Sequence, residues 1–253
     1  MISKIKKISV DRDMIKYLAV IPMVIGHFCG YLSNDMLYKD MHPAVYVLMQ
    51  TALFAPPVFF FFISEGFRYT RSRKKYAVRL LIFALINQVP FCLANYGTLL
   101  TTEFFLNLNI IFTLLLGLIS IMIWETKLKT APRIILIVLL DALTFVLTSE
   151  WMIFGIPIIL GFHIFRDRPK ERFIWFLSMV TMQEIMIAVF GFSGWFYTLL
   201  GTFITFASMM VAYYVIFHCY SGEKGKHPAF AKWFFYIIYP VHLWVIYIVL
   251  YVI

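Results

Sequence analysis

Charged residues are scarce in this sequence, and acidic residues are the scarcest: 13 Asp and Glu stand against 22 Lys and Arg. Charged residues make up 14% of the chain, against roughly a quarter in a soluble domain. The three cysteines are odd in number and lie in or beside apolar runs, so we expect no disulfide framework and no metal site. The sequence also has no GxSxG, HExxH or Walker phosphate loop, so it lacks the motifs that mark serine hydrolases, zinc proteases and nucleotide triphosphatases.

Long hydrophobic runs are abundant, because 62% of the residues are hydrophobic. A membrane span needs roughly 20 mainly apolar residues. We expect nine spans: Met14–Leu32, Ala44–Ser64, Tyr76–Ala94, Phe104–Trp124, Pro132–Thr148, Trp151–Phe165, Phe173–Gly191, Phe196–Phe217 and Phe230–Tyr251. Only the short polar sequence Thr148-Ser149-Glu150 separates the fifth run from the sixth. The sequence thus predicts an all-α polytopic transmembrane helix bundle, a single domain over residues 1–253.

The basic residues predict how the bundle is oriented. If the amino end is cytoplasmic and the spans alternate, every Lys and Arg except Lys39 falls on the inner side. Lys and Arg near span ends favour the cytoplasmic side, so we expect the carboxyl end outside. This bias also explains the net charge of +9 without a nucleic-acid partner; the partner implied is the lipid bilayer.

The largest basic cluster follows the second span and contains Arg68, Arg71, Arg73, Lys74, Lys75 and Arg79. These residues, here called the basic loop, serve either to hold topology against anionic lipid head groups or to bind phosphate, since guanidinium groups match phosphate oxygens. The second reading makes the loop the binding site of a nucleotide-bearing donor. Glu65 precedes Arg68 by three residues, so it is either an ion-pair partner on the same helix face or an acid that orients a base.

Few strongly polar groups lie inside the expected spans. His27 and His242 lie at similar depth in the first and last spans, and each is either a packed histidine or a base, because histidine titrates near neutral pH. Asn87, Gln88 and Asn109 lie in the third and fourth spans. Interhelical hydrogen bonding is the first expectation for these amides, and Asn87 and Asn109 are also candidates for substrate binding.

Three stretches carry a family resemblance. They are Phe62–Tyr76 with its Ser-Glu-Gly-Phe-Arg run, Asn109–Gly117, and Lys232–Leu243 with its Tyr-Pro-Val-His run. The chain resembles the TraX family, within the wider group of integral-membrane acyltransferases, over nearly its whole length. His27 lies where that family carries a first-span histidine.

Two positions depart from the family pattern. The family usually has an acid directly before the first-span histidine, and here that residue is Gly26. A family Asp-Tyr-Gly pattern is replaced by Ser149-Glu150-Trp151. If the missing acid normally orients the histidine, Glu65 or Glu150 is its candidate substitute.

The resemblance implies an enzyme that transfers an acetyl group from acetyl-CoA to an amine or hydroxyl acceptor, at or beyond a bacterial plasma membrane. The family's best-known member acetylates a pilin subunit, so a pilin-like peptide or another envelope component is the acceptor implied. In this reading Arg68, Arg71, Arg73, Lys74 and Arg79 hold the CoA phosphates, His27 takes the acceptor proton, and Asn109 or His242 stabilises the oxyanion. A small-solute transporter or flippase and a non-catalytic assembly scaffold are the alternatives.

Overall fold

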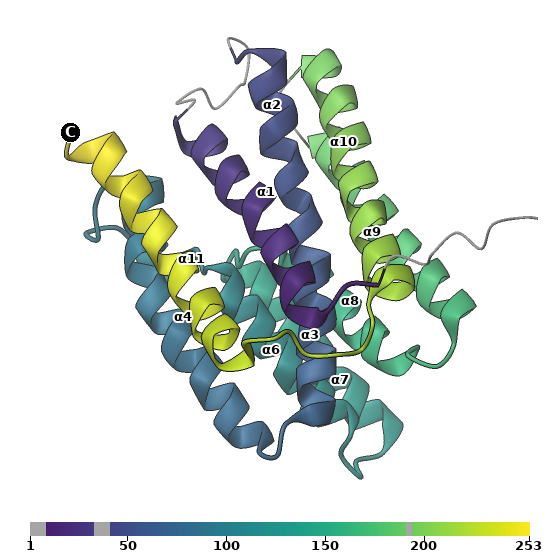
Figure 1. The fold of residues 1–253 in the computed structure, drawn as a ribbon. Helices are drawn as coiled ribbons and strands as arrows, with labels where there is room; N and C mark the ends of the chain where they lie inside the picture. The colour runs from purple at the N-terminus through teal and green to yellow at the C-terminus, as the bar shows by residue number, and fades with distance from the viewer. Residues whose placement is uncertain (1–8, 33–40, 191–193) are drawn as a thin grey trace, which may run out of the picture. The chain divides into compact units, whose positions relative to one another are not determined.

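The computed structural model describes residues 9–32, 41–190 and 194–253, and helices dominate this part of the chain (Figure 1). The described residues contain no β-strand, only an isolated bridge between Val10 and Tyr220. The helices are α1 (Arg12–Leu32), α2 (Pro43–Gln50), α3 (Ala55–Tyr69), α4 (Arg73–Tyr96), α5 (Glu103–Leu106), α6 (Ile110–Trp124), α7 (Thr130–Val146), α8 (Met152–Ile164), α9 (Pro169–Phe190), α10 (Gly194–Tyr214) and α11 (Pro228–Tyr251). The 3₁₀ turn η1 (Thr51–Phe54) and the π turn η2 (Val215–Cys219) complete the set.

Each of the nine expected spans coincides with a helix or a run of consecutive helices, so the all-helical prediction is confirmed. Seven helical segments in the described residues are long and apolar enough to cross a membrane. The helices of the fifth and sixth spans are shorter, with 17 residues in α7 and 13 in α8. The count of nine spans and the orientation of the termini stay predictions, and Lys39 lies outside the described residues.

The polar break between α7 and α8 is a tight turn, as the sequence predicts. Thr148 and Trp151 have positive φ angles of 36° and 68°, which non-glycine residues seldom adopt. The backbone N–H of Ser149 donates to the carbonyl of Thr144 at 2.9 Å. The turn ends α7 and reverses the chain before α8, and it places Glu150 between the two helices.

The chain divides into two compact units, and the first comprises residues 1–58 and 192–237. Within it, α1 and α10 each pack against α2 and η1. A Cβ atom at Gly26 would lie 2.5 Å from Cβ of Ala52 and 2.8 Å from the carbonyl oxygen of Met49. Glycine therefore allows α1 and η1 to approach closely, and the acid that the family usually carries before His27 has no room here.

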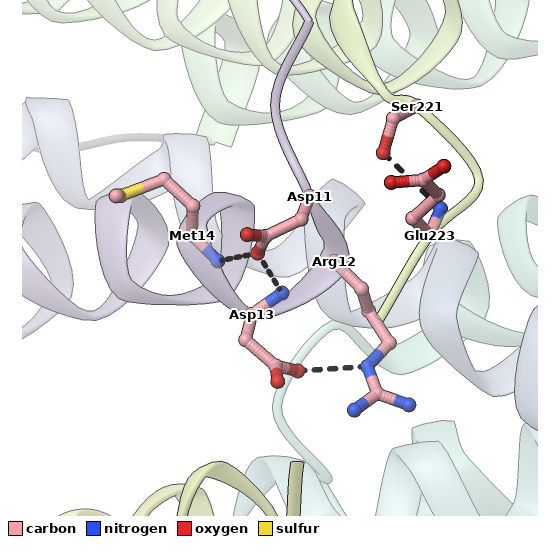
Figure 2. A network of polar contacts seen from close by, with 6 residues as sticks. All are labelled: Asp11, Arg12, Asp13, Met14, Ser221 and Glu223. Carbon is pink, nitrogen blue, oxygen red and sulfur yellow. Dashed lines mark hydrogen bonds and ion pairs between the residues drawn. The ribbon is translucent and has the colours of Figure 1, made fainter. Parts of the chain in front are cut away.

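The start of α1 is fixed by polar contacts within the same unit (Figure 2). The carboxylate of Asp11 accepts hydrogen bonds from the backbone N–H groups of Asp13 at 3.0 Å and Met14 at 2.9 Å, which caps the helix. Arg12 pairs with Asp13 through Nε at 2.8 Å. The backbone N–H of Arg12 also donates to the carbonyl of Glu223 at 3.0 Å, so the segment after η2 is bound to the beginning of α1.

The second unit comprises residues 59–191 and 238–253, and α6 is its centre. Helix α6 contacts α4, α7 and α8, and α8 contacts α9 (Figure 1). Small residues permit the close approach of α6 and α8: a Cβ at Gly155 would lie 2.3 Å from Cγ2 of Thr113, and a Cβ at Gly117 would lie 2.3 Å from Cδ1 of Ile159. Small residues at helix contacts are typical of membrane bundles.

Candidate active site

The amino end of α6 is built around Asn109, whose side chain is fully buried. Its Oδ1 accepts from the backbone N–H of Ile111 at 3.1 Å, which caps the helix. Its Nδ2 donates to the carbonyl of Ala84 at 2.9 Å and to Oε1 of Gln88 at 2.8 Å. Asn109 therefore makes the interhelical hydrogen bonds expected of it, and both amide hydrogens are engaged. The role of Asn109 in oxyanion stabilisation stays a prediction.

Gln88 extends this network from α4. Its Nε2 donates to the carbonyl of Phe104 at 3.0 Å and to that of Asn107 at 2.6 Å, while its Oε1 accepts from Asn109. The buried amide thus joins α4 to α5, to the residue that follows α5 and to the start of α6. A buried polar network in which every partner is satisfied holds its members rigidly.

Glu150, in the turn between α7 and α8, lies directly at this helix end. Its Oε2 accepts from the backbone N–H of Ile110 at 2.6 Å and from the hydroxyl of Tyr239 at 3.1 Å. Its Oε1 has no hydrogen-bond partner among the described residues. Burial raises the pKa of Glu150 to about 6, and the two hydrogen bonds oppose this rise. The carboxylate is therefore held through Oε2, and its pKa lies above the ordinary value for glutamate.

Two hydroxyl groups and an aromatic contact fix the turn that carries Glu150. The hydroxyls of Thr113 and Ser149 lie 2.7 Å apart, and Thr113 also donates to the backbone carbonyl of Glu150. The ring of Trp151 packs edge-on against Phe60, with centroids 5.2 Å apart. These contacts determine where the Glu150 side chain points.

His242 lies beside Tyr239 on α11. The ring centroids are 5.3 Å apart, and Nδ1 of His242 lies 2.9 Å from the carbonyl oxygen of Ile238. A carbonyl oxygen only accepts, so Nδ1 carries the hydrogen, and in the neutral ring Nε2 is the acceptor. His242 is buried and is oriented as a proton acceptor.

These residues form one group, here called the Glu150 cluster. All of them lie in the second unit, on α4, α6, α11 and the α7–α8 turn. The members are Gln88, Asn109, Thr113, Ser149, Glu150, Tyr239 and His242. The sequence indicates His242 and Asn109 as candidates, indicates Glu150 only as a substitute acid, and does not indicate Tyr239. Two features of the sequence could have indicated Glu150 and Tyr239: Glu150 is a single acid in a short polar break, and Tyr239 lies one helical turn before His242.

A second polar group lies near the other end of α6. Glu65 forms an ion pair with Arg166 at 2.5 Å, and not the expected local pair with Arg68. His163 pairs with Glu125, the residue that follows α6, at 2.8 Å. Glu65 is thus held by a distant cation on the α8–α9 connection, which favours a positioning role over direct chemistry.

The basic loop begins beside this group. The guanidinium of Arg73 lies 4.0 Å from the ring centroid of Phe67, which in turn packs edge-on against His163. Arg68 and Arg79 lie over Tyr69 and Tyr76, at 5.5 Å and 5.2 Å. Side chains of Arg68, Arg71, Arg73 and Lys74 are exposed, and the first turn of α4 has no acid. These cations lie at the amino end of α4, which is the positive end of the helix dipole, so they repel one another and the dipole. An anionic ligand would relieve this repulsion, so the loop is suited to bind one.

The remaining predicted residues are His27, in the first unit, and Asn87, in the second. His27 lies on α1 in the first unit, 6.0 Å from the ring centroid of Tyr31. The structure therefore does not bring His27 and His242 together within one unit. Asn87 is fully buried on α4, next to Gln88.

The fold and the cluster define a class: a helical protein with several helices long and apolar enough to span a membrane, and with a network of buried polar side chains inside the bundle. The chain belongs to the TraX family, because the model of the TraX protein matches residues 11–250. It is 26% identical over 249 residues to the probable fimbrial assembly protein FimC, serogroup H1, of Dichelobacter nodosus, over 94% of this chain and 95% of that protein. No solved structure matches the chain.

Proposed function

We propose that this protein is a membrane-embedded acetyltransferase that moves an acetyl group from cytosolic acetyl-CoA to an amine or hydroxyl acceptor. The observation that carries the proposal is the pairing of two features in one unit. Glu150, with one fixed and one unpartnered carboxylate oxygen, lies at one end of α6. The exposed basic loop reaches the other end through Phe67 and His163.

The two ends of α6 are separated by a distance suited to a long, thin donor. Fifteen residues at about 1.5 Å each give roughly 21 Å. In the proposed topology, with nine spans and a cytoplasmic amino end, the basic loop faces the cytosol and Glu150 faces the outer side of a bacterial plasma membrane. The CoA phosphates then bind Arg68, Arg71, Arg73, Lys74 and Arg79, and the pantetheine arm extends toward Glu150.

Glu150 is the proposed base. Its Oε1 accepts the proton of the acceptor amine or hydroxyl as the nucleophile attacks the thioester carbonyl carbon. The C–S bond then breaks, and the proton passes to the leaving CoA sulfur. His242, oriented with Nε2 as acceptor, and His27, implied by the resemblance, are the alternative bases, and Glu65 positions Arg166 beside the donor phosphates.

The acceptor is proposed from the relative that the chain resembles. That protein is named a probable fimbrial assembly protein, which favours a pilin-like peptide or another envelope component. A non-catalytic role in assembly and a transport role are the competing readings, and both predict that acetyl-CoA is not consumed.

The test is donor binding and thioester turnover by the purified protein in detergent, with acetyl-CoA and no added acceptor. We expect saturable binding that Arg71→Ala weakens, and slow release of CoA that Glu150→Gln abolishes while binding persists. Lys127→Ala is the matched control, since Lys127 is an exposed cation outside the basic loop. Absence of both binding and turnover in the wild type would remove the proposal.

A further inference from the structure

Asn87 carries a buried polar atom that no described residue satisfies. The residue is 0% exposed. Its Nδ2 donates to the carbonyl oxygen of Phe83 at 2.5 Å, but its Oδ1 is buried and has no hydrogen-bond partner among the described residues. Most buried polar atoms in proteins are hydrogen-bonded, and an unpaired acceptor is unfavourable.

The alternative orientation of the amide does not remove this feature. Exchanging oxygen and nitrogen would place Oδ1 against the carbonyl oxygen of Phe83, and two acceptors repel. It would also leave the N–H groups buried without a partner. One end of the Asn87 amide is therefore unpaired in either orientation, and the orientation with a free acceptor is the favourable one.

Asn87 lies at the level of the Glu150 cluster. Its neighbour Gln88 bonds Asn109, and the next residue, Ile110, donates to Glu150. Asn87 is thus one residue away from the hydrogen-bonded network that ends at Glu150. A ligand that bonds Oδ1 of Asn87 must present an N–H and must otherwise tolerate an apolar surrounding.

We infer that Oδ1 of Asn87 accepts a hydrogen bond from a secondary amide N–H in the pantetheine arm of the acyl donor, the amide nearest the thioester sulfur. This inference rests on the proposed function. The arm is a chain of methylene groups interrupted by amides, so one of its N–H groups is the type of donor that a buried amide oxygen accepts from. The bond fixes the distance between the thioester and Glu150, which makes Asn87 a donor-binding residue.

The experiment compares Asn87→Leu with wild type in detergent, by equilibrium binding of CoA and by thermal unfolding. We expect the variant to unfold at the same or a higher temperature than wild type without ligand, because leucine removes an unpaired polar atom. We expect its affinity for CoA to fall by roughly tenfold, the effect of one hydrogen bond in a buried site. Adenosine 3′,5′-bisphosphate, which lacks the arm, binds both proteins equally.

Gln88→Leu is the matched control, because Gln88 makes hydrogen bonds to Phe104, Asn107 and Asn109. It should lower the unfolding temperature without ligand. Asn87→Ala removes the same oxygen with less volume and should show the same loss of CoA affinity if the leucine variant does not fold.

The outcomes separate this inference from the proposed function. If wild type binds CoA and Asn87→Leu binds it equally well, the inference is wrong and the proposed function stands. If Asn87→Leu and Asn87→Ala are both destabilised without ligand as Gln88→Leu is, Asn87 has a structural role and the inference is again wrong. If wild type binds neither CoA nor the bisphosphate, both are overturned.

Discussion

The hydrogen bond between Tyr239 and Glu150 predicts a measurable change in pH dependence. Replacing Tyr239 with phenylalanine keeps the ring beside His242 but removes the hydroxyl that donates to Oε2 of Glu150 at 3.1 Å. A hydrogen bond to a carboxylate stabilises its charged form. Without that donor, the pKa of Glu150 rises above its value of about 6, because the N–H of Ile110 alone remains to oppose burial.

The size of the shift follows from the geometry. A hydrogen bond to a charged group contributes about 1.5–3 kcal/mol, and one pKa unit corresponds to about 1.4 kcal/mol. The separation of 3.1 Å is long for an O–H···O⁻ contact, so the low end applies. The pKa should therefore rise by about one unit.

The assay is the initial rate of CoA release from acetyl-CoA, measured across pH values on both sides of 6. A base acts in its deprotonated form, so the wild-type rate should rise through about pH 6 and then level off. In Tyr239→Phe the rise should move to a pH about one unit higher, with little change in the plateau. Tyr247→Phe alters a tyrosine further along α11 and should leave the profile unchanged. An unshifted profile in Tyr239→Phe, or one shifted to lower pH, would refute the assignment of Glu150 as the base.

Three further predictions concern stability, measured as the apparent unfolding temperature in detergent. Asn109→Ala removes a helix cap and leaves the carbonyl of Ala84 and Oε1 of Gln88 with fewer donors. The free energy of unfolding should therefore fall by roughly 2–4 kcal/mol. An unchanged unfolding temperature would show that these hydrogen bonds do not stabilise the protein. Gly26→Asp restores the acid that the family usually has at this position. Because Ala52 occupies the space that the aspartate side chain would need, the variant should be less stable than wild type by more than about 2 kcal/mol and no more active. A stable, more active variant would show that this space is open. Glu65→Gln should destabilise by about 1–2 kcal/mol by leaving Arg166 unpaired, and Arg166→Met in the same chain should recover part of the loss.

The helices could be predicted from the sequence because apolar length alone determines them. Each expected span contains a helix, and the break at Thr148-Ser149-Glu150 is a turn with positive φ angles at Thr148 and Trp151. Length could not settle whether α7 and α8 cross a membrane, since their 17 and 13 residues fall at or below the usual limit.

The sequence could predict candidate residues but not the contacts between helices, because spacing along one helix indicates only local neighbours. It favoured Arg68 as the partner of Glu65, whereas the structure pairs Glu65 with Arg166. The contact between Tyr239 and Glu150 joins residues 89 positions apart, and no local pattern encodes it. The buried amides were found because strongly polar groups in apolar runs are rare, and Asn109 does bond across helices.

The departure at Gly26 has a physical explanation. The sequence shows that an acid is missing but not why, whereas the close approach of Ala52 and Met49 leaves no room for one. In the second unit, Glu150 supplies a carboxylate at the amino end of α6. We therefore propose Glu150 as the base.

The most direct test of the central claim is the transfer of radiolabelled acetyl from acetyl-CoA, followed in purified wild type and in Glu150→Gln. We expect thioester turnover in wild type and a loss of roughly 10²–10⁴-fold in the variant, while CoA affinity changes little. Turnover by Glu150→Gln at the wild-type rate, together with loss of turnover in His27→Ala, would contradict the assignment of Glu150 and return the base to the first unit. No turnover in wild type, with acetyl-CoA left intact, would contradict the acetyltransferase itself.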